Sequence, residues 1–163
     1  LGGCLWLFFT LCSKAVEFLD TYFLLVMGKK VGALQFFHHA FAGADMWILW
    51  KYHNEGIWIF VQFNSFIHTL MYFYFGAAAL GISAGPLKII MTALQLIQLT
   101  VGNTLSIAYI YYTCYNQDIY LMISWCFNML YISGLILLFA EFFYSSYLTP
   151  KPKKGEKGIK KTE

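Results

Sequence analysis

The chain has 163 residues, of which 60% are hydrophobic, 20% are aromatic and only 12% are charged. Because soluble domains carry about a quarter charged residues, this composition excludes an ordinary water-soluble domain and favours a protein surrounded by lipid. The chain contains no arginine, the residue that most often contacts phosphates and bases, which argues against a nucleic-acid binder.

Five stretches of mostly apolar residues follow one another, each near the ~20 residues that a helix needs to cross a membrane. They cover residues 4–27, 31–50, 57–80, 88–112 and 119–147. Polar or Gly/Ser/Pro-rich segments, which are typical of loops and turns, separate them. We therefore predict an all-α, polytopic membrane helix bundle with five transmembrane helices over residues 1–149, followed by a lysine-rich tail over residues 150–163.

The distribution of lysines predicts how these spans are oriented. Lys29, Lys30, Lys88 and the tail fall on one side of a five-span bundle, whereas Lys51 falls on the other. Because positively charged loops stay in the cytosol, we expect the lysine-rich side and the C-terminus to be cytosolic.

Both ends of the chain carry further signals. Leu1 stands inside an apolar run with no charged residues before it, so we expect a missing natural N-terminus rather than a signal peptide. Lys160 and Lys161 are the fourth and third residues from the C-terminus, where a cytosolic dilysine resembles the retrieval signal of endoplasmic-reticulum membrane proteins. A generic lysine-rich tail is the alternative interpretation.

The first span contains three charged residues. Ionisable side chains inside a membrane are costly, so they usually face the interior of a bundle and mark function. Lys14, Glu17 and Asp20 are spaced three residues apart, which places them along one face of a helix. They could pin helices together as an ion-pair network or support a functional site, and both interpretations remain open.

The second and third spans contain histidines. Gln35 and His38 share one helix face, whereas His39 points about 100° away, so one histidine could react while a neighbour orients the other. Asn64 and His68 share a face of the third span at a spacing of four residues. Two separate helices thus each present a histidine with an amide one turn before it, which favours a site over isolated core histidines.

The fourth span carries Thr92, Gln95 and Gln98 at a spacing of three residues, where they could bond to neighbouring helices or line a polar tunnel. At ~1.5 Å per residue, Gln95, Gln98 and His38 fall roughly 10–15 Å below the cytosolic face. His68 and the charged trio of the first span fall near mid-membrane. We expect one chamber, entered from the cytosol, to hold all of these groups.

Together these residues resemble the fatty-acid elongase family, the membrane 3-ketoacyl-CoA synthases of the endoplasmic reticulum. Residues 14–21 match the family motif KxxExxDT, residues 92–98 match TxxQxxQ, and residues 64–75 match NxxxHxxMYxYY except that Phe75 replaces the last tyrosine. The family's histidine box, HxxHH, begins here with Gln35 instead of histidine. This LQxFHH form resembles the Δ9-type elongases of polyunsaturated C18 acyl chains from algae and protists.

The resemblance implies a seven-span protein that condenses a long-chain acyl-CoA with malonyl-CoA, releasing CO2 and free CoA, without a cofactor or metal. It implies an acyl intermediate on His38, assisted by His68, with His39 as a supporting neighbour, although His68 could carry the acyl group instead. The residues expected to bind substrate or support the site are Lys14, Glu17, Asp20, Gln35, Asn64, Tyr72, Gln95 and Gln98. Trp47, Trp50 and Trp58 could close the far end of an acyl tunnel or form an interfacial aromatic belt.

The same resemblance implies partners for the rest of the elongation cycle, namely a ketoacyl-CoA reductase, a dehydratase and an enoyl reductase, and it leaves a homodimer open. Two other classes also fit parts of the sequence. A di-iron desaturase or hydroxylase would need about eight histidines by family analogy, whereas this chain has four. A non-enzymatic proton-coupled transporter could use intramembrane Lys, Glu, Asp and His as a relay.

Overall fold

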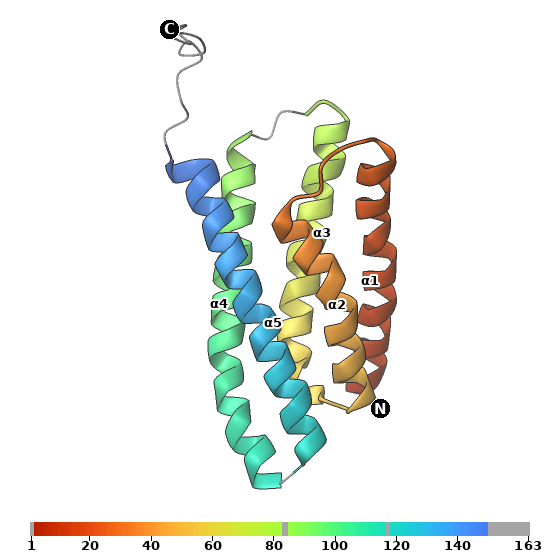
Figure 1. Cartoon of the computed structure of the whole chain (residues 1–163), viewed down its shortest axis with the longest axis vertical. Coiled ribbons are helices and arrows are strands. Elements are labelled where there is room, and N and C mark those ends of the chain that lie inside the picture. The colour runs from red at the N-terminus through yellow and green to blue at the C-terminus, as the bar shows by residue number, and fades with distance from the viewer. Residues whose placement is uncertain (1, 83–84, 117, 150–163) are drawn as a thin grey trace, which may run out of the picture.

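The computed structural model describes residues 2–82, 85–116 and 118–149. Within these ranges the chain forms five α-helices and no β-strand, as the sequence predicts (Figure 1). The helices are α1 (Gly2–Val26), α2 (Ala33–Lys51), α3 (Trp58–Ala79), α4 (Gly85–Asn116) and α5 (Ile119–Phe143). A short 3-10 helix, Glu55–Ile57, precedes α3, and a π-helical turn, Tyr144–Leu148, continues α5. The predicted tail, with Lys160 and Lys161, lies outside the described residues.

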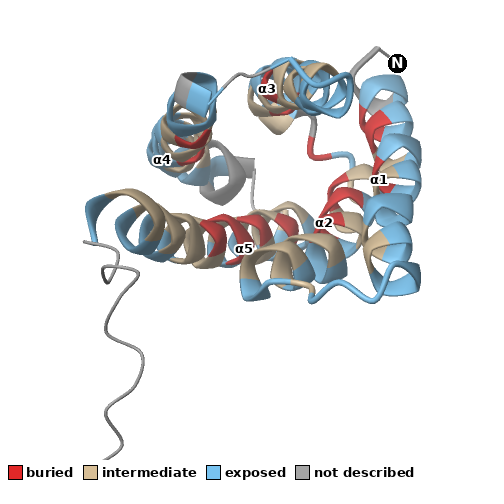
Figure 2. Ribbon diagram, turned by 90° about the horizontal axis from the view of Figure 1, so that it is seen from above, coloured by how far each residue is buried: buried red, intermediate tan, exposed pale blue. Residues whose placement is uncertain are grey.

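The helices stand side by side and alternate in direction, and together they form a ring. Seen from above, the order around the ring is α1, α2, α5, α4 and α3, and each helix packs against its two neighbours in this order (Figure 2). Lys29, in the connection between α1 and α2, and Lys88, in the first turn of α4, lie at one end of the bundle, which we call the lysine end. Lys51, at the end of α2, lies at the opposite end.

Backbone geometry sets the ends of three helices. Gly28 and Gly81 have φ values of +67° and +79°, a left-handed conformation that costs glycine little and that closes α1 and α3. The backbone N–H groups just after each helix then donate to carbonyls of its last turn. At the start of α5, the Asp118 carboxylate accepts hydrogen bonds from the backbone N–H groups of Tyr120 and Leu121, at 2.9 and 3.1 Å.

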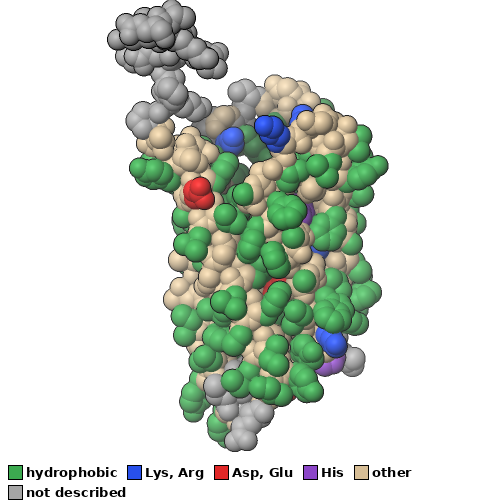
Figure 3. All heavy atoms as spheres, in the orientation of Figure 1, with side chains coloured by type: hydrophobic (Ala, Val, Ile, Leu, Met, Phe, Trp, Pro, Cys, Tyr) green, Lys and Arg blue, Asp and Glu red, His purple; other side chains and the backbone are tan. Residues whose placement is uncertain are grey.

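On the face of the bundle shown in Figure 3, hydrophobic side chains far outnumber charged ones. Every helix exposes large hydrophobic side chains, including Phe9, Phe36, Phe73, Ile107 and Leu130. Two helical stretches, Leu87–Tyr111 and Ile119–Leu148, are long and apolar enough to cross a membrane by composition alone. The other three helices carry the charged residues and histidines that the sequence singles out within spans. A continuous apolar wall of this kind suits lipid rather than water, so the chain is an all-α membrane helix bundle.

Close contacts at glycines hold α3, α4 and α5 against their neighbours. The ring of Phe60 on α3 lies directly over Gly102 of α4, where no Cβ would fit without movement. The ring of Phe37 on α2 lies over Gly134 of α5 in the same way. Both phenylalanines pack against an apolar core formed by Ala42, Leu99, Tyr131, Ile132 and Leu135. Small residues at such points let helix backbones approach closely inside a membrane.

Buried polar pairs link helices in the half of the bundle away from the lysine end. Asp45 of α2 is fully buried and accepts a 2.8 Å hydrogen bond from Asn128 of α5. Asn54, in the loop before α3, donates to Ser124 of α5 at 2.9 Å. Interhelical hydrogen bonds in membranes contribute about 0.6 kcal/mol on average, so their main effect here is to fix which helices are neighbours.

The contact at Gly102 gives a test of the packing. Gly102→Ala should destabilise the bundle by about 1–3 kcal/mol, because the added methyl group collides with the Phe60 ring. Gly76→Ala, at a helical glycine with open space around it, is the matched control and should be neutral or stabilising by about 0.5–1 kcal/mol. Thermal unfolding of the purified protein in detergent measures both, and equal stability of the two variants would contradict the packing described.

Candidate active site

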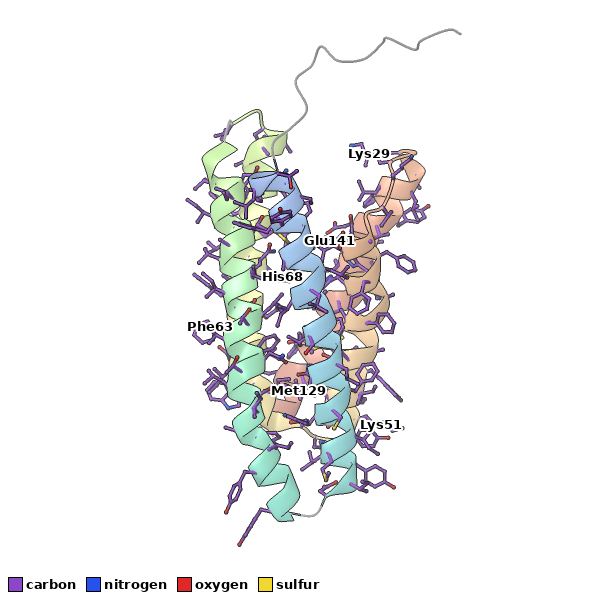
Figure 4. The ribbon with its side chains drawn as sticks, turned by 60° about the vertical axis from the view of Figure 1, so that its left-hand side comes forward. Lys29, Lys51, Phe63, His68, Met129 and Glu141 are labelled. Carbon is purple, nitrogen blue, oxygen red and sulfur yellow. The ribbon has the colours of Figure 1, made fainter. Side chains whose placement is uncertain are left out.

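Three helices bring a histidine, a second histidine and a carboxylate together in the interior. Glu17 of α1, His38 of α2 and His68 of α3 each offer one ligand atom, and these atoms all lie within 4.8 Å of one another. The rings of His38 and His68 are 5.8 Å apart between centroids. Along the bundle, His68 lies between Lys29 at one end and Lys51 at the other (Figure 4). The ring order explains the meeting, because α1 packs between α2 and α3.

An ion pair neutralises the carboxylate of this cluster. Lys14 Nζ lies 2.9 Å from both carboxylate oxygens of Glu17, one helical turn away on α1. The Lys14 and Glu17 side chains are only 7% and 11% exposed. On its other side, Glu17 Oε1 lies 3.5 Å from His68 Nδ1, and at this geometry no hydrogen bond forms. The interaction expected from the spacing of Lys14 and Glu17 is therefore present, and it places the carboxylate beside a histidine.

Asp20 links α1 to α3 through a tyrosine. Its carboxylate accepts a 2.7 Å hydrogen bond from the Tyr72 hydroxyl of α3. Each step of three residues turns a helix by about 300°, so Asp20 faces about 60° away from Glu17 and reaches the outer side of α3. A small pocket of about 330 Å³ between α1 and α3 is lined by Ser13, Val16, Glu17, Asp20 and Tyr72.

The remaining residues of the second span surround His38. The His39 ring meets the His38 ring edge-on, with centroids 5.1 Å apart, and packs against Phe18 of α1 at 5.9 Å. Gln35 Nε2 donates to the Thr21 hydroxyl across the α1–α2 interface at 3.4 Å. Gln35 and His39 thus both contact α1, and His39 also packs against His38.

The amides of α3 and α4 differ in their surroundings. Gln95 Nε2 lies 3.3 Å from the Met71 sulfur, so Gln95 links α4 to α3. Gln98 Nε2 is buried and donates no hydrogen bond within the described residues. Asn64 is half-buried one turn before His68. Of these three amides, Gln98 borders the large cavity of the bundle.

That cavity has a volume of about 760 Å³ and runs from the level of the histidines toward the end opposite the lysines. Ile67, the residue before His68, lines its upper part, and the loop residues Asn54 and Ile57 line its far end. Apolar side chains of α3 and α4 form most of the wall. Neither His38 nor His68 is among its lining residues, but its upper end reaches Ile67, next to His68 in the chain. An apolar cavity of this size can hold a long hydrocarbon chain.

The far end of the cavity contains residues that sequence reasoning missed. Tyr109 of α4 and Trp125 of α5 line it, whereas Trp47, Trp50 and Trp58 do not. Trp125 is held by a 2.8 Å hydrogen bond from its indole Nε1 to the Ser106 carbonyl. Asn128 of α5 also lines the cavity. A polar side chain within such an apolar helix was a sequence signal that could have identified this residue as facing the interior.

The cluster has the groups that acyl transfer requires. A neutral imidazole can attack a carbonyl as a nucleophile or accept a proton as a base, and a nearby carboxylate can orient it. The same donor set of two imidazoles and one carboxylate can also bind a metal ion.

Comparison with known proteins gives a consistent result. A sequence model of the GNS1/SUR4 family (ELO) matches residues 3–155. Fatty acid elongase 2 of Trypanosoma brucei brucei (strain 927/4 GUTat10.1) is 33% identical over 155 residues, which cover 89% of this chain and 56% of that protein. Very long chain fatty acid elongase 4 of Macaca mulatta is 36% identical over 166 residues, 96% of this chain and 50% of that protein.

Long chain fatty acid elongase 2 of Caenorhabditis elegans is 30% identical over 152 residues, 89% of this chain and 55% of that protein. The chain spans about half the length of these curated relatives. No solved structure matches the chain. Because the family model covers almost all of the sequence, the chain belongs to the GNS1/SUR4 (ELO) family.

Proposed function

We propose that this protein is a fatty acid elongase that condenses a long-chain acyl-CoA with malonyl-CoA to a 3-ketoacyl-CoA. The observation that carries the proposal is the meeting of His38 and His68 beside Glu17, in a bundle whose apolar cavity reaches up to Ile67, the residue before His68. The three relatives above carry the name elongase, which supports the same activity.

In the first step, a ring nitrogen of His38 attacks the thioester carbonyl of the acyl-CoA. The carbon–sulfur bond breaks, CoA leaves as the thiolate, and the proton released from the imidazole is carried by a base or by the thiolate. The product is an acyl-imidazole on His38. This step needs a neutral imidazole with a free lone pair, and an interior poor in water strengthens the polar interactions around it.

In the second step, malonyl-CoA loses CO2, and the electron pair of the broken carbon–carbon bond forms an enolate on the remaining acetyl-CoA. The enolate carbon attacks the acyl carbonyl and His38 leaves, which gives a 3-ketoacyl-CoA two carbons longer. His68 lies on the side of His38 where it can hold a proton or contact a carbonyl oxygen. Glu17, 3.5 Å from His68 Nδ1, can fix the orientation of that ring.

The two ends of the bundle suit the two ends of the substrate. The acyl tail would enter the 760 Å³ cavity, whose volume lies in the range of about 300–1,000 Å³ typical of ligand pockets. The CoA moiety would remain at the lysine end, where Lys29, Lys30 and Lys88 attract its phosphates. The LQxFHH form of the histidine box supports a polyunsaturated C18 acyl chain as the substrate.

The cellular setting of the proposal follows from the same chemistry. The 3-ketoacyl-CoA product requires a ketoacyl-CoA reductase, a dehydratase and an enoyl reductase to complete one cycle. The dilysine at Lys160 and Lys161 would keep the protein in the endoplasmic-reticulum membrane, with its C-terminus in the cytosol.

Substitution of either histidine tests the activity. His38→Ala and His68→Ala should each lower incorporation of radiolabelled malonyl-CoA into longer acyl chains by at least ~10²-fold, because each removes a nucleophile or proton carrier. Microsomes that contain the full-length protein provide the assay. His53→Asn is the matched control: His53 is exposed in a loop with a φ of 51°, a conformation that asparagine also adopts, and activity should be retained. Near-normal activity of His38→Ala would remove it as the nucleophile.

The acyl intermediate can be trapped. Incubation of the purified protein with an acyl-CoA alone should release about one CoA per active site and leave an acyl group on the peptide that contains His38, as read by mass spectrometry. His38→Ala should show neither the released CoA nor the modified peptide. An acyl group found on His68 instead would reverse the roles of the two histidines, and absence of any adduct with full elongation activity would exclude a covalent route.

The far wall of the cavity should limit chain length. Trp125→Ala opens space at the end away from the histidines, so the products should extend by one or more two-carbon cycles relative to the unaltered protein. Leu130→Ala, on the lipid-facing side of the same helix, is the control and should leave the product spectrum unchanged. Gas chromatography of the fatty acids reads the lengths, and an unchanged distribution for Trp125→Ala would argue against the tail lying in this cavity.

A further inference from the structure

The cluster of Glu17, His38 and His68 has a geometry that its catalytic use does not require. Two imidazoles and one carboxylate from three different helices bring their ligand atoms to within 4.8 Å of one another. His68 Nδ1 is buried and forms no hydrogen bond among the described residues, although Glu17 Oε1 lies 3.5 Å away. The donor set, two histidines and one glutamate, is one that binds zinc in proteins.

The ligand atoms are close to, but not at, the positions that a bound ion needs. Zinc–nitrogen and zinc–oxygen bonds are about 2.0–2.2 Å long, so ligand atoms around one tetrahedral ion stand roughly 3.5 Å apart. Movements of about 1 Å would bring the three side chains to that spacing. The imidazoles must be neutral and the carboxylate ionised for this purpose, which are the same forms that acyl transfer uses.

Lys14 places a positive charge directly beside this cluster. Its ammonium contacts both oxygens of Glu17 at 2.9 Å and already compensates the carboxylate. A metal ion at the cluster must therefore share Glu17 with Lys14 or displace it. Without Lys14, Glu17 would have both oxygens free, and Asp20 in the adjoining pocket would add a second negative charge.

We propose that Glu17, His38 and His68 form a binding site for a zinc-like divalent cation, and that Lys14 weakens it. The ion would be a reversible inhibitor and not a resident cofactor. Because His38 would give its lone pair to the metal, it could not attack a thioester. The inhibitory part rests on the proposed elongase function, whereas the binding part does not.

Cobalt(II) tests the binding directly, because its visible absorption changes when histidine and carboxylate ligands replace water. Titration of the full-length protein in detergent with Co²⁺ should give the spectrum of a site with nitrogen and oxygen ligands, and Zn²⁺ should remove it. Loss of even an outer-shell partner weakens metal sites by about 10–100-fold, so Glu17→Gln and His68→Ala should weaken binding by at least tenfold. His53→Asn, in the exposed loop, should not change it.

Lys14→Met provides a second test, in which the expected result is tighter Co²⁺ binding. Misfolding could explain a loss of affinity but not a gain. It should bind Co²⁺ more tightly than the unaltered protein by about tenfold, because it frees both oxygens of Glu17. In the elongation assay, micromolar-range Zn²⁺ should inhibit the unaltered protein, and a chelator should restore its activity.

Two results would overturn the site: no change in the Co²⁺ spectrum on titration, or a spectrum that Glu17→Gln, His68→Ala and Lys14→Met all leave unchanged. A Co²⁺ spectrum with the expected dependence on these variants supports the site even where no elongation is detected. That combination would count against the proposed function alone. Elongation that Zn²⁺ leaves intact while Co²⁺ binds at the cluster would overturn the inhibitory part.

Discussion

The buried ion pair of Lys14 and Glu17 is the constraint on which the rest of the interior depends. A carboxylate inside a membrane bundle is costly unless it is paired, and breaking a buried pair by removing one partner leaves an uncompensated charge. The pair fixes which side of α1 faces inward. That rotation brings Glu17 to within 3.5 Å of His68 and sends Asp20 to the Tyr72 hydroxyl. One interaction thus positions both acids of the helix.

The order of the helices around the ring determines which side chains meet in each part of the interior. Since α1 packs between α2 and α3, an acid from α1 stands beside the two histidines that those helices contribute. The same ring separates a polar upper region from the apolar cavity below it. Farther from the lysine end, Asp45 and Asn128 bond across α2 and α5 and hold that side of the ring together. The histidine cluster and the apolar cavity therefore follow one another along the length of the bundle.

The sequence predicted the helices well because their boundaries depend on local chemistry. Lengths of apolar residues, the glycines at positions 28 and 81 and the capping Asp118 act within a few residues, and each helix begins and ends close to its predicted position. The spacing of Lys14 and Glu17 likewise predicted their ion pair. Partners on other helices could not be predicted in this way. Nothing in the local pattern tells that Asn128 meets Asp45, or that Trp125 rather than Trp47 lines the cavity, because these depend on the order of helices around the ring.

A histidine that must act as a nucleophile keeps a lone pair that is neither protonated nor bonded, and this is also what makes a good metal ligand. Placing two such histidines beside a carboxylate favours nucleophilic attack and metal binding alike. Lys14 acts on metal binding alone, because its ammonium compensates Glu17 and competes with an incoming cation for the same carboxylate oxygens. It takes no lone pair from either imidazole. With the proposed acyl transfer and the proposed cation site, an ammonium one turn from Glu17 would serve two ends at once. It makes a buried carboxylate tolerable in the membrane, and it would keep the histidines available to an acyl group rather than to a metal ion.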